Sequence, residues 1–237
     1  MERAKTVMNS TGRIISADPS VVKRFWAWFG KSKVVDNEGR PLVVFHGTQA
    51  DFKAFDPEQS NSNAATGVPT GSFVFTDNPE VAQSYYMAQA SVARFANEAL
   101  ADEFYNLIKT GTFAEQMQFL HDNPQIREPE YHEGGNTMPV YLRIERPLVV
   151  NAKGDRWDDI IFKPRGWQRE EIVTTNEIAQ WGKDNGYDGA IIRNVKDVHK
   201  GTPHKATTYF VFSPGQIKSA ISNTTFDGGS TAIDEDA

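Results

Sequence analysis

Residues 41–48 read PLVVFHGT, a short apolar run that ends in a polar triplet. The apolar residues 42–45 are typical of a buried strand, and that strand presents His46, Gly47 and Thr48 at its end. Glycine lets a ligand approach the backbone closely, and an imidazole offers one donor and one acceptor to a ribose hydroxyl. In the alternative interpretation, His46 is a core histidine bonded to a nearby carbonyl group.

The segments on either side of this strand predict short strands mixed with helices. Asp18 and Pro19 open a helix whose apolar stripe ends at Gly30. Residues 73–76, FVFT, predict a strand, and the sequence DNPE at 77–80 then starts a helix that continues, with breaks, to about residue 121. Further strands are predicted at 32–35, 140–144, 148–150, 189–192 and 209–212, a helix at 175–185, and loops at 49–70, 122–137 and 194–207. Because strands and helices do not alternate regularly, the pattern predicts an α+β fold.

The composition excludes several classes of protein. The chain has 237 residues, of which 39% are hydrophobic, and this is enough apolar material for one large core. It has no cysteine, which excludes disulfides, thiolate metal sites and thiol nucleophiles. The net charge of −6 argues against a general nucleic-acid binder, because such proteins need a basic face. No long apolar run predicts a membrane helix or signal core, so we expect a cytoplasmic protein.

Tyr85 is the second candidate for a binding role. It lies on the predicted helix that follows strand 73–76. An aromatic ring beside a histidine at a strand end would form a flat slot, and a cationic nicotinamide ring gains roughly 1–2 kcal/mol by stacking on such a face. Ordinary core packing next to Tyr86 is the alternative interpretation.

Several stretches taken together resemble a known family. In chain order they are PLVVFHGT, FKAFD, GSFVFTDNPEVAQSY, GYDGAII and TYFVFSPGQIKSA, within residues 20–222. They look like an ADP-ribosyltransferase domain of the diphtheria-toxin and poly-ADP-ribose-polymerase type, and most closely like the domains of phage and mobile-element polyvalent proteins. The resemblance implies a split, mostly antiparallel sheet around a cleft for NAD⁺, with helices at the periphery. It also implies NAD⁺ as substrate and a macromolecular acceptor.

The signature triad of that family is His, Tyr and Glu. The resemblance carries the His to His46, which would hold the adenosine-side ribose and the nicotinamide end of NAD⁺, and the second stacking aromatic to Tyr85. It places Gly47 against the nicotinamide amide, with Thr48 beside it. The first stacking aromatic would fall at Val74, which is a departure. A different strand register would let Phe73 or Phe75 fill that place.

The Glu of the triad falls at Thr208, the start of TYFVFS. A carboxylate there stabilises positive charge on the sugar as the nicotinamide bond breaks, and threonine supplies no charge. The replacement implies transfer of a single ADP-ribose or a loss of activity. Gln216 would orient a substrate amide or satisfy a local turn, and Asp188 is expected to be a structural turn residue.

The chain is therefore expected to be a mono-ADP-ribosyltransferase that modifies a bacterial protein, with His46, Tyr85, Thr208 and Gln216 as its catalytic set. The alternatives are a module that only binds NAD⁺ or ADP-ribose and a phage accessory protein.

Loop 194–207 has three Lys and two His against one Asp, which suits an acidic or phosphate-bearing partner or a solvated loop. His199 and His204 lack a close third ligand, so no metal site is expected. The expected organisation is a flexible arm at 1–18, one domain at 19–223 with a helical insertion near 94–137, and a disordered acidic tail at 224–237.

Overall fold

A computed structural model describes residues 8–48, 52–60, 71–89, 136–197 and 204–234, with a few single positions between 103 and 123. Of residues 86–89 it describes the backbone alone. The helical insertion expected near 94–137 lies outside the described residues apart from those single positions and its last two residues. Within the described residues, no helix is long and apolar enough to cross a membrane.

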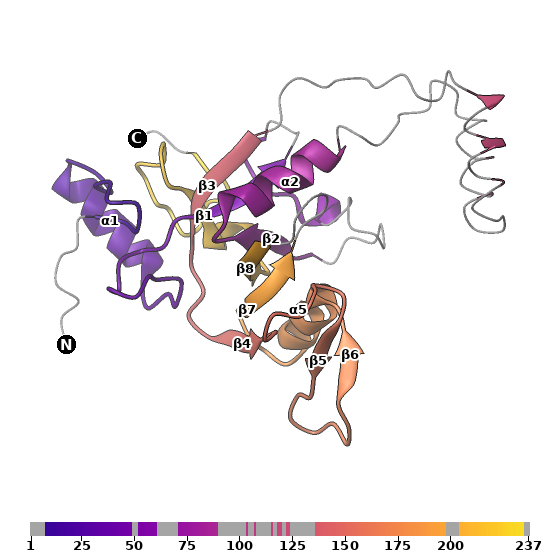
Figure 1. Cartoon of the computed structure of the whole chain (residues 1–237). Coiled ribbons are helices and arrows are strands. Elements are labelled where there is room, and N and C mark those ends of the chain that lie inside the picture. Colours follow the sequence, from indigo (N-terminus) through magenta and orange to yellow (C-terminus); the bar gives the residue numbers. More distant parts are fainter. Residues whose placement is uncertain are drawn as a thin grey trace.

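A seven-stranded sheet forms the centre of the molecule, as Figure 1 shows. The strands lie in the order β4-β7-β8-β2-β1-β3-β9. β4 and β7 are parallel to each other, and the other neighbours in this sheet are antiparallel. The bounds are β1 Val44–Thr48, β2 Phe73–Thr76, β3 Asn136–Leu142, β4 Pro147–Asn151, β7 Gly189–Asp197, β8 His204–Val211 and β9 Ile217–Ser219. This sheet and its flanking helices confirm the α+β class and the mostly antiparallel sheet.

The sheet is split between β1 and β2. These two strands share one partner pair, Phe45 with Thr76, whereas β1 and β3 share five pairs. The split separates the half made of β4, β7, β8 and β2 from the half made of β1, β3 and β9. It occurs beside His46, where the sequence predicted a binding cleft.

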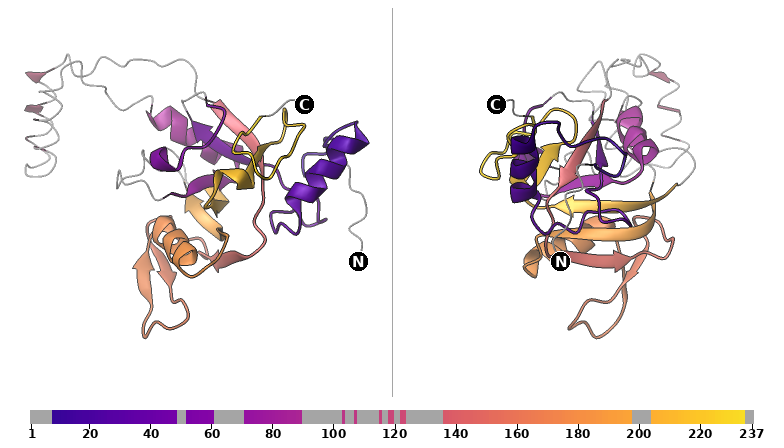
Figure 2. Two further views of the ribbon diagram at one scale, coloured as in Figure 1. Left: turned by 180° about the vertical axis from the view of Figure 1, so that it is seen from behind. Right: turned by 90° about the vertical axis from the view of Figure 1, so that its left-hand side faces the viewer.

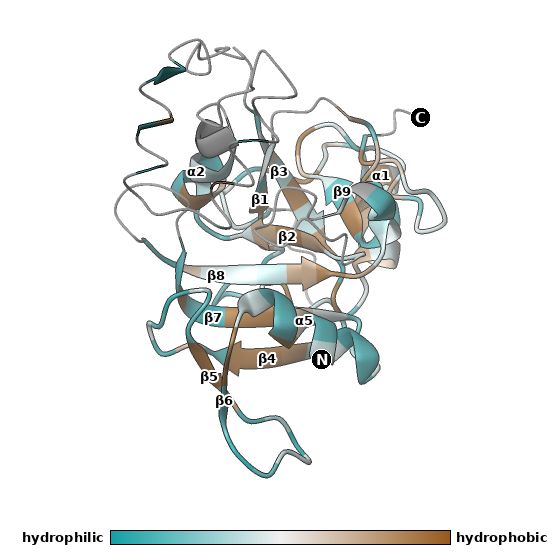
Figure 3. Cartoon of the chain, turned by 90° about the vertical axis from the view of Figure 1, so that its right-hand side faces the viewer, coloured by the Kyte–Doolittle hydropathy of each residue, from teal (hydrophilic) through white to brown (hydrophobic). Residues whose placement is uncertain are grey.

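Within the described residues, three α-helices and a small hairpin pack around the sheet. They are α1 Pro19–Phe29, α2 Pro79–Gln89, α5 Thr175–Asp184, and the two-stranded sheet of β5 Ile160–Phe162 and β6 Glu171–Val173; single 3₁₀ turns are η1 Pro57–Gln59 and η3 Pro214–Gln216. The carboxylate of Asp18 accepts a hydrogen bond from the Ser20 amide at the start of α1, as its sequence predicts. In Figure 3, β4 and the first half of β7 are mainly hydrophobic, whereas much of α5 is hydrophilic.

Two predictions about loops and strands differ from the structure. Strands β7 and β8 extend through most of the segment 194–207, which was expected to be a loop. The expected strand at 32–35 contributes one isolated bridge, between Val35 and Pro41. In the first case, the ladder has a register shift between Ile192 and Val195, and this irregularity interrupts the alternation that reveals a strand.

Both ends of the described chain pack against the core, contrary to the expected flexible arm and disordered tail. In the arm, Nδ2 of buried Asn9 donates a hydrogen bond to the hydroxyl of Tyr141. In the tail, the side chains of Phe226 and Ile233 are buried, and Phe226 packs edge-on against Phe25 of α1. Figure 2 shows this C-terminal segment beside α1, at the end of the molecule away from α5. Polar composition hides these anchors, because one apolar side chain every few residues is enough to bind a segment to a core.

Candidate functional site

The register of the strands fixes which side chains share a face at the split. Cross-strand partners lie on one face, and neighbours along a strand alternate between faces. Phe45 pairs with Thr76, and Thr76 pairs with Thr208, so these three side chains lie on one face. Gly47 shares that face because it is two residues from Phe45, whereas His46 points to the opposite face. The structure therefore does not place the side chains of His46 and Thr208 on one face.

His46 is surrounded by aromatic rings. The centroid of its imidazole lies 5.0 Å from that of Phe55, 5.5 Å from Phe75 and 6.3 Å from Phe52. Its Nδ1 lies 2.9 Å from the carbonyl oxygen of Val74. This is the contact that the core-histidine interpretation predicts. It also bridges the split, because Val74 belongs to β2 and His46 to β1.

The state of the His46 ring follows from these contacts. Burial lowers the pKa of His46, and the bond to the Val74 carbonyl only partly opposes this effect. The imidazole is therefore neutral at pH 7. Because a carbonyl oxygen can only accept, Nδ1 carries the proton and Nε2 keeps a lone pair. Nε2 can thus accept a hydrogen bond from a hydroxyl group.

Gly47 is required by helix packing. A Cβ atom at this position would lie 1.8 Å from the carbonyl oxygen of Ala82 in α2, so no side chain fits there. The sequence suggested a glycine that admits a ligand, and in the structure the backbone of α2 occupies the space above its Cα. Tyr85 is three residues after Ala82, which places both on one side of the helix. Because Gly47 has no side chain, the side of α2 that contains Tyr85 can pack directly on the sheet.

Tyr85 is tied to the far half of the sheet. Its hydroxyl donates a hydrogen bond of 2.7 Å to Oδ1 of Asp197 at the end of β7. Burial, and then the charge of Asp197, raise the pKa of Tyr85 well above its ordinary value, so the phenol stays protonated. Close by, Nδ1 of His204 lies 3.5 Å from Oε2 of Glu80 at the start of α2. Two contacts thus join α2 to the β7–β8 hairpin.

Thr208 lies in the middle of the sheet, at the position where the family has its Glu. It is 1% exposed and pairs with Thr76 on β2 and Ile192 on β7. Its Oγ1 is buried and has no hydrogen-bond partner within the described structure. An unpartnered buried hydroxyl costs about 1–3 kcal/mol and calls for an explanation, such as a bound water or ligand.

The remaining candidates on β1 and β2 are divided between the two faces. Phe73 and Phe75 are buried in the core cluster that surrounds His46. Val74, at the place of the first stacking aromatic, packs with the other cluster on the Thr208 face. Thr48 is buried on the His46 face, at the end of β1. Neither phenylalanine of β2 therefore shares a face with Thr208.

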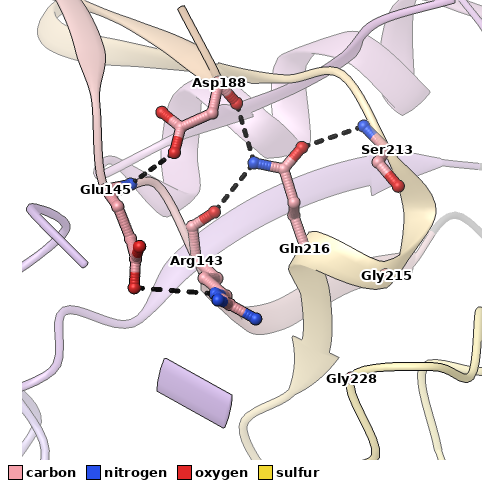
Figure 4. A pocket seen from close by; sticks show the side chains of 7 residues that line it. All are labelled: Arg143, Glu145, Asp188, Ser213, Gly215, Gln216 and Gly228. Atoms are coloured by element: carbon pink, nitrogen blue, oxygen red, sulfur yellow. Dashed lines mark hydrogen bonds and ion pairs between the residues drawn. The ribbon is translucent and has the colours of Figure 1, made fainter. Parts of the chain in front are cut away.

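Gln216 is fully occupied by backbone groups. Its Oε1 accepts from the amides of Phe212 and Ser213, and its Nε2 donates to the carbonyls of Arg143 and Asp188. These bonds use both donors and both lone pairs of the amide. Gln216 lines an open depression of about 260 Å³ near η3, shown in Figure 4. Its contacts are those of the turn-satisfying interpretation.

Asp188, beside it, has the structural role expected for a turn aspartate. Its carboxylate accepts hydrogen bonds from the backbone amides of Glu145 and Arg146. Among the described residues, no cluster of His, Asp or Glu has the arrangement of a metal site.

Sequence reasoning missed two contributors to this region. The sequence predicts that Asp197 is a charge in a loop, whereas in the structure it is 3% exposed and bonded to Tyr85. The sequence places Phe55 in a loop and gives it no role, whereas in the structure its ring packs on His46. A partial signal for Asp197 exists, because Val195 and Asp197 are spaced as residues on one face of a strand.

Comparison with known proteins gives one finding on family. A family model described as ADP-ribosyltransferase in polyvalent proteins matches residues 36–97 and 98–226, which is most of the chain. No curated protein and no solved structure matches. The matched region contains β1, β2, α2, β8 and η3, and it includes every candidate residue discussed above.

Proposed function

We propose, from the premise that this chain belongs to the family of ADP-ribosyltransferases in polyvalent proteins, that it transfers a single ADP-ribose from NAD⁺ to a macromolecular acceptor. The acceptor in this proposal is a bacterial protein. One observation carries the proposal. Tyr85 lies on the side of α2 that packs on Gly47, above the sheet face that contains Thr208. Gly47, Tyr85 and Thr208 thus lie on one side of the sheet, and this arrangement supports the proposal.

The proposed reaction begins with the bond between C1′ of the ribose and the nicotinamide nitrogen. As this bond breaks, its electron pair moves to the nitrogen and positive charge develops on the sugar. A nucleophilic atom of the acceptor then forms the new bond to C1′ and loses its proton to solvent. Such a loose, dissociative reaction depends on holding the sugar in a reactive position, and we assign this role to the residues of the site.

Each residue has a role suited to its surroundings. The ring of Tyr85 supplies a stacking face for the cationic nicotinamide. The backbone of Gly47 and Thr48 faces the nicotinamide amide, and the neutral Nε2 of His46 accepts from a ribose hydroxyl. Since His46 points to the other face, a nucleotide that uses both groups must cross the split between β1 and β2. Oγ1 of Thr208 is free to donate to a ribose oxygen.

The acceptor and the number of transferred units follow from charge. Thr208 contributes no carboxylate to activate the ribose of an earlier product, which argues for a single transfer. The net charge of −6 favours a protein acceptor over a nucleic acid.

A second candidate function rests on the same threonine. Without the family carboxylate, developing charge on the sugar is not neutralised at this position. The chain would then bind NAD⁺ or ADP-ribose without turnover, and the unpartnered Oγ1 of Thr208 would be satisfied by the bound ribose.

Release of nicotinamide from NAD⁺ by the purified protein, with and without bacterial lysate, tests the proposal. We expect release that needs lysate, label from adenylate-labelled NAD⁺ on a protein band, and loss of both in Tyr85→Ala and His46→Ala. Tyr187→Ala, which removes a half-exposed tyrosine that packs on Trp181, is the matched control and should behave as wild type. Binding of NAD⁺ without release would favour the second candidate.

A further inference from the structure

The hydrogen bond between Tyr85 and Asp197 joins residues that are 112 positions apart in the sequence. Asp197 is 3% exposed, at the last position of β7. Burying a carboxylate is unfavourable unless it accepts hydrogen bonds, so its partners are held firmly. The phenol of Tyr85 is one of these partners.

The contacts of α2 fix the Tyr85 ring at both ends. At its base, the Ala82 carbonyl oxygen lies against Gly47, where no Cβ fits, so the backbone of α2 packs directly on β1. At its tip, the hydroxyl is held 2.7 Å from Asp197. A tyrosine has two side-chain torsions, and holding both ends fixes the position of the ring and the direction of its long axis.

We propose that Asp197 is a positioning residue for the nicotinamide site, where its buried carboxylate holds the ring of Tyr85 in place for stacking. This inference rests on the proposed function, because it assigns Tyr85 to the nicotinamide ring. A stacking face that is already ordered loses less entropy when the ligand arrives, and this improves affinity. We therefore expect Asp197 to affect the affinity for NAD⁺, which has the nicotinamide ring, and not the affinity for ADP-ribose, which lacks it.

The protonation state of the pair supports a constant role across the physiological pH range. Burial and the nearby carboxylate raise the pKa of the Tyr85 phenol, so the tyrosine remains the donor and Asp197 the acceptor. The positioning does not depend on a titration near neutrality.

The test compares binding of NAD⁺ with binding of ADP-ribose, by calorimetry on the full chain. The variants are Asp197→Ala, Asp197→Asn, Tyr85→Phe and the double variant Tyr85→Phe with Asp197→Ala. We expect Asp197→Ala to weaken NAD⁺ binding roughly tenfold and to leave ADP-ribose binding within about twofold. Asp197→Asn keeps an acceptor oxygen for the phenol and should restore most of the affinity. In the Tyr85→Phe background, Asp197→Ala should add no further loss, because the two residues act through one bond.

Glu80→Ala is the matched control. It removes a second contact between α2 and β8, that of the Glu80 carboxylate with His204, and should change neither affinity. Equal weakening of NAD⁺ and ADP-ribose in Asp197→Ala would overturn the proposal and leave Asp197 a residue of the fold. Wild-type affinity in Asp197→Ala would overturn it while the proposed function stands. A wild-type protein that binds ADP-ribose but not NAD⁺, or neither, would overturn both.

Discussion

His46 shows how its environment decides what one side chain can do. An exposed imidazole with a pKa near 6.5 would exchange protons around neutrality. Here burial among phenylalanine rings lowers that pKa, and the Val74 carbonyl selects the tautomer. His46 is therefore a fixed, neutral hydrogen-bond acceptor. It is poorly suited to act as a general base at pH 7, because taking up a proton would leave a buried cation.

The lowered pKa predicts a loss of stability in acid. Between the folded-state pKa of His46 and about 6.5, the unfolded chain binds more protons than the folded chain, so stability rises with pH in this window. The contribution of His46 is complete above about pH 6.5 and is lost as pH falls through the window. His46→Gln, whose amide can still donate to Val74, should lose less melting temperature between pH 7.5 and pH 5 than wild type. Parallel melting curves for the two proteins over this range would contradict the prediction.

Gly47 carries a steric prediction. Gly47→Ala places a methyl group where the Ala82 carbonyl oxygen lies, so α2 must move from β1. We expect a loss of about 2 kcal/mol or more in the free energy of unfolding, together with loss of NAD⁺ binding. Denaturant melts and calorimetry measure the two effects. Gly228→Ala, where the nearest atom lies at an ordinary contact distance of 3.6 Å, should change neither, and equal effects of the two variants would refute the steric account.

At the scale of elements, Gln216 connects three parts of the chain. Its amide joins the end of β3, the start of β7 and the turn at η3. Gln216→Glu keeps the two acceptor bonds to the Phe212 and Ser213 amides, but it turns a carboxylate oxygen toward two carbonyls. We expect a destabilisation of about 1–3 kcal/mol in thermal or urea unfolding, with an unchanged Kd for NAD⁺ in the protein that remains folded. A large change in the Kd for NAD⁺ together with wild-type stability would contradict this prediction and indicate that Gln216 takes part in binding.

Sequence patterns reveal elements when periodicity is regular and fail where it is interrupted. The cap at Asp18 and the helix predicted at 175–185 follow from local residue types, and the structure confirms the cap and a helix at Thr175–Asp184. The strand predicted at 42–45 exists but is shifted to Val44–Thr48, so that it includes His46. The ends of β7 and β8 were missed because a register shift after Ile192 breaks the alternation, and because Lys and His suggest a loop. The contact between Asp197 and Tyr85 was also missed, because two residues far apart in the sequence leave no local pattern of their contact.

At the scale of the whole molecule, the C-terminal segment connects distant parts of the core. Ile233 packs in the cluster that contains Phe55, and its amide donates to the carbonyl of Lys53. The segment that carries the ring of Phe55 onto His46 is therefore held in part by the tail. The fully buried Lys218 donates to the carbonyls of Ser230 and Ala232, which binds the tail to β9.

Removal of residues 224–237 is therefore expected to weaken the fold, although their composition resembles that of a dispensable tail. The truncation exposes the surfaces that Phe226 and Ile233 cover and takes two backbone acceptors from the buried ammonium of Lys218. Losing one buried aromatic and one aliphatic side chain costs about 3 kcal/mol or more, which corresponds to a fall of at least about 5 °C in Tm. Scanning calorimetry measures this, with a truncation of residues 235–237 alone as control, since that variant keeps both apolar anchors. Equal melting temperatures for the two truncations would show that the tail does not anchor the fold, whereas a fall confined to the longer one would show that it does.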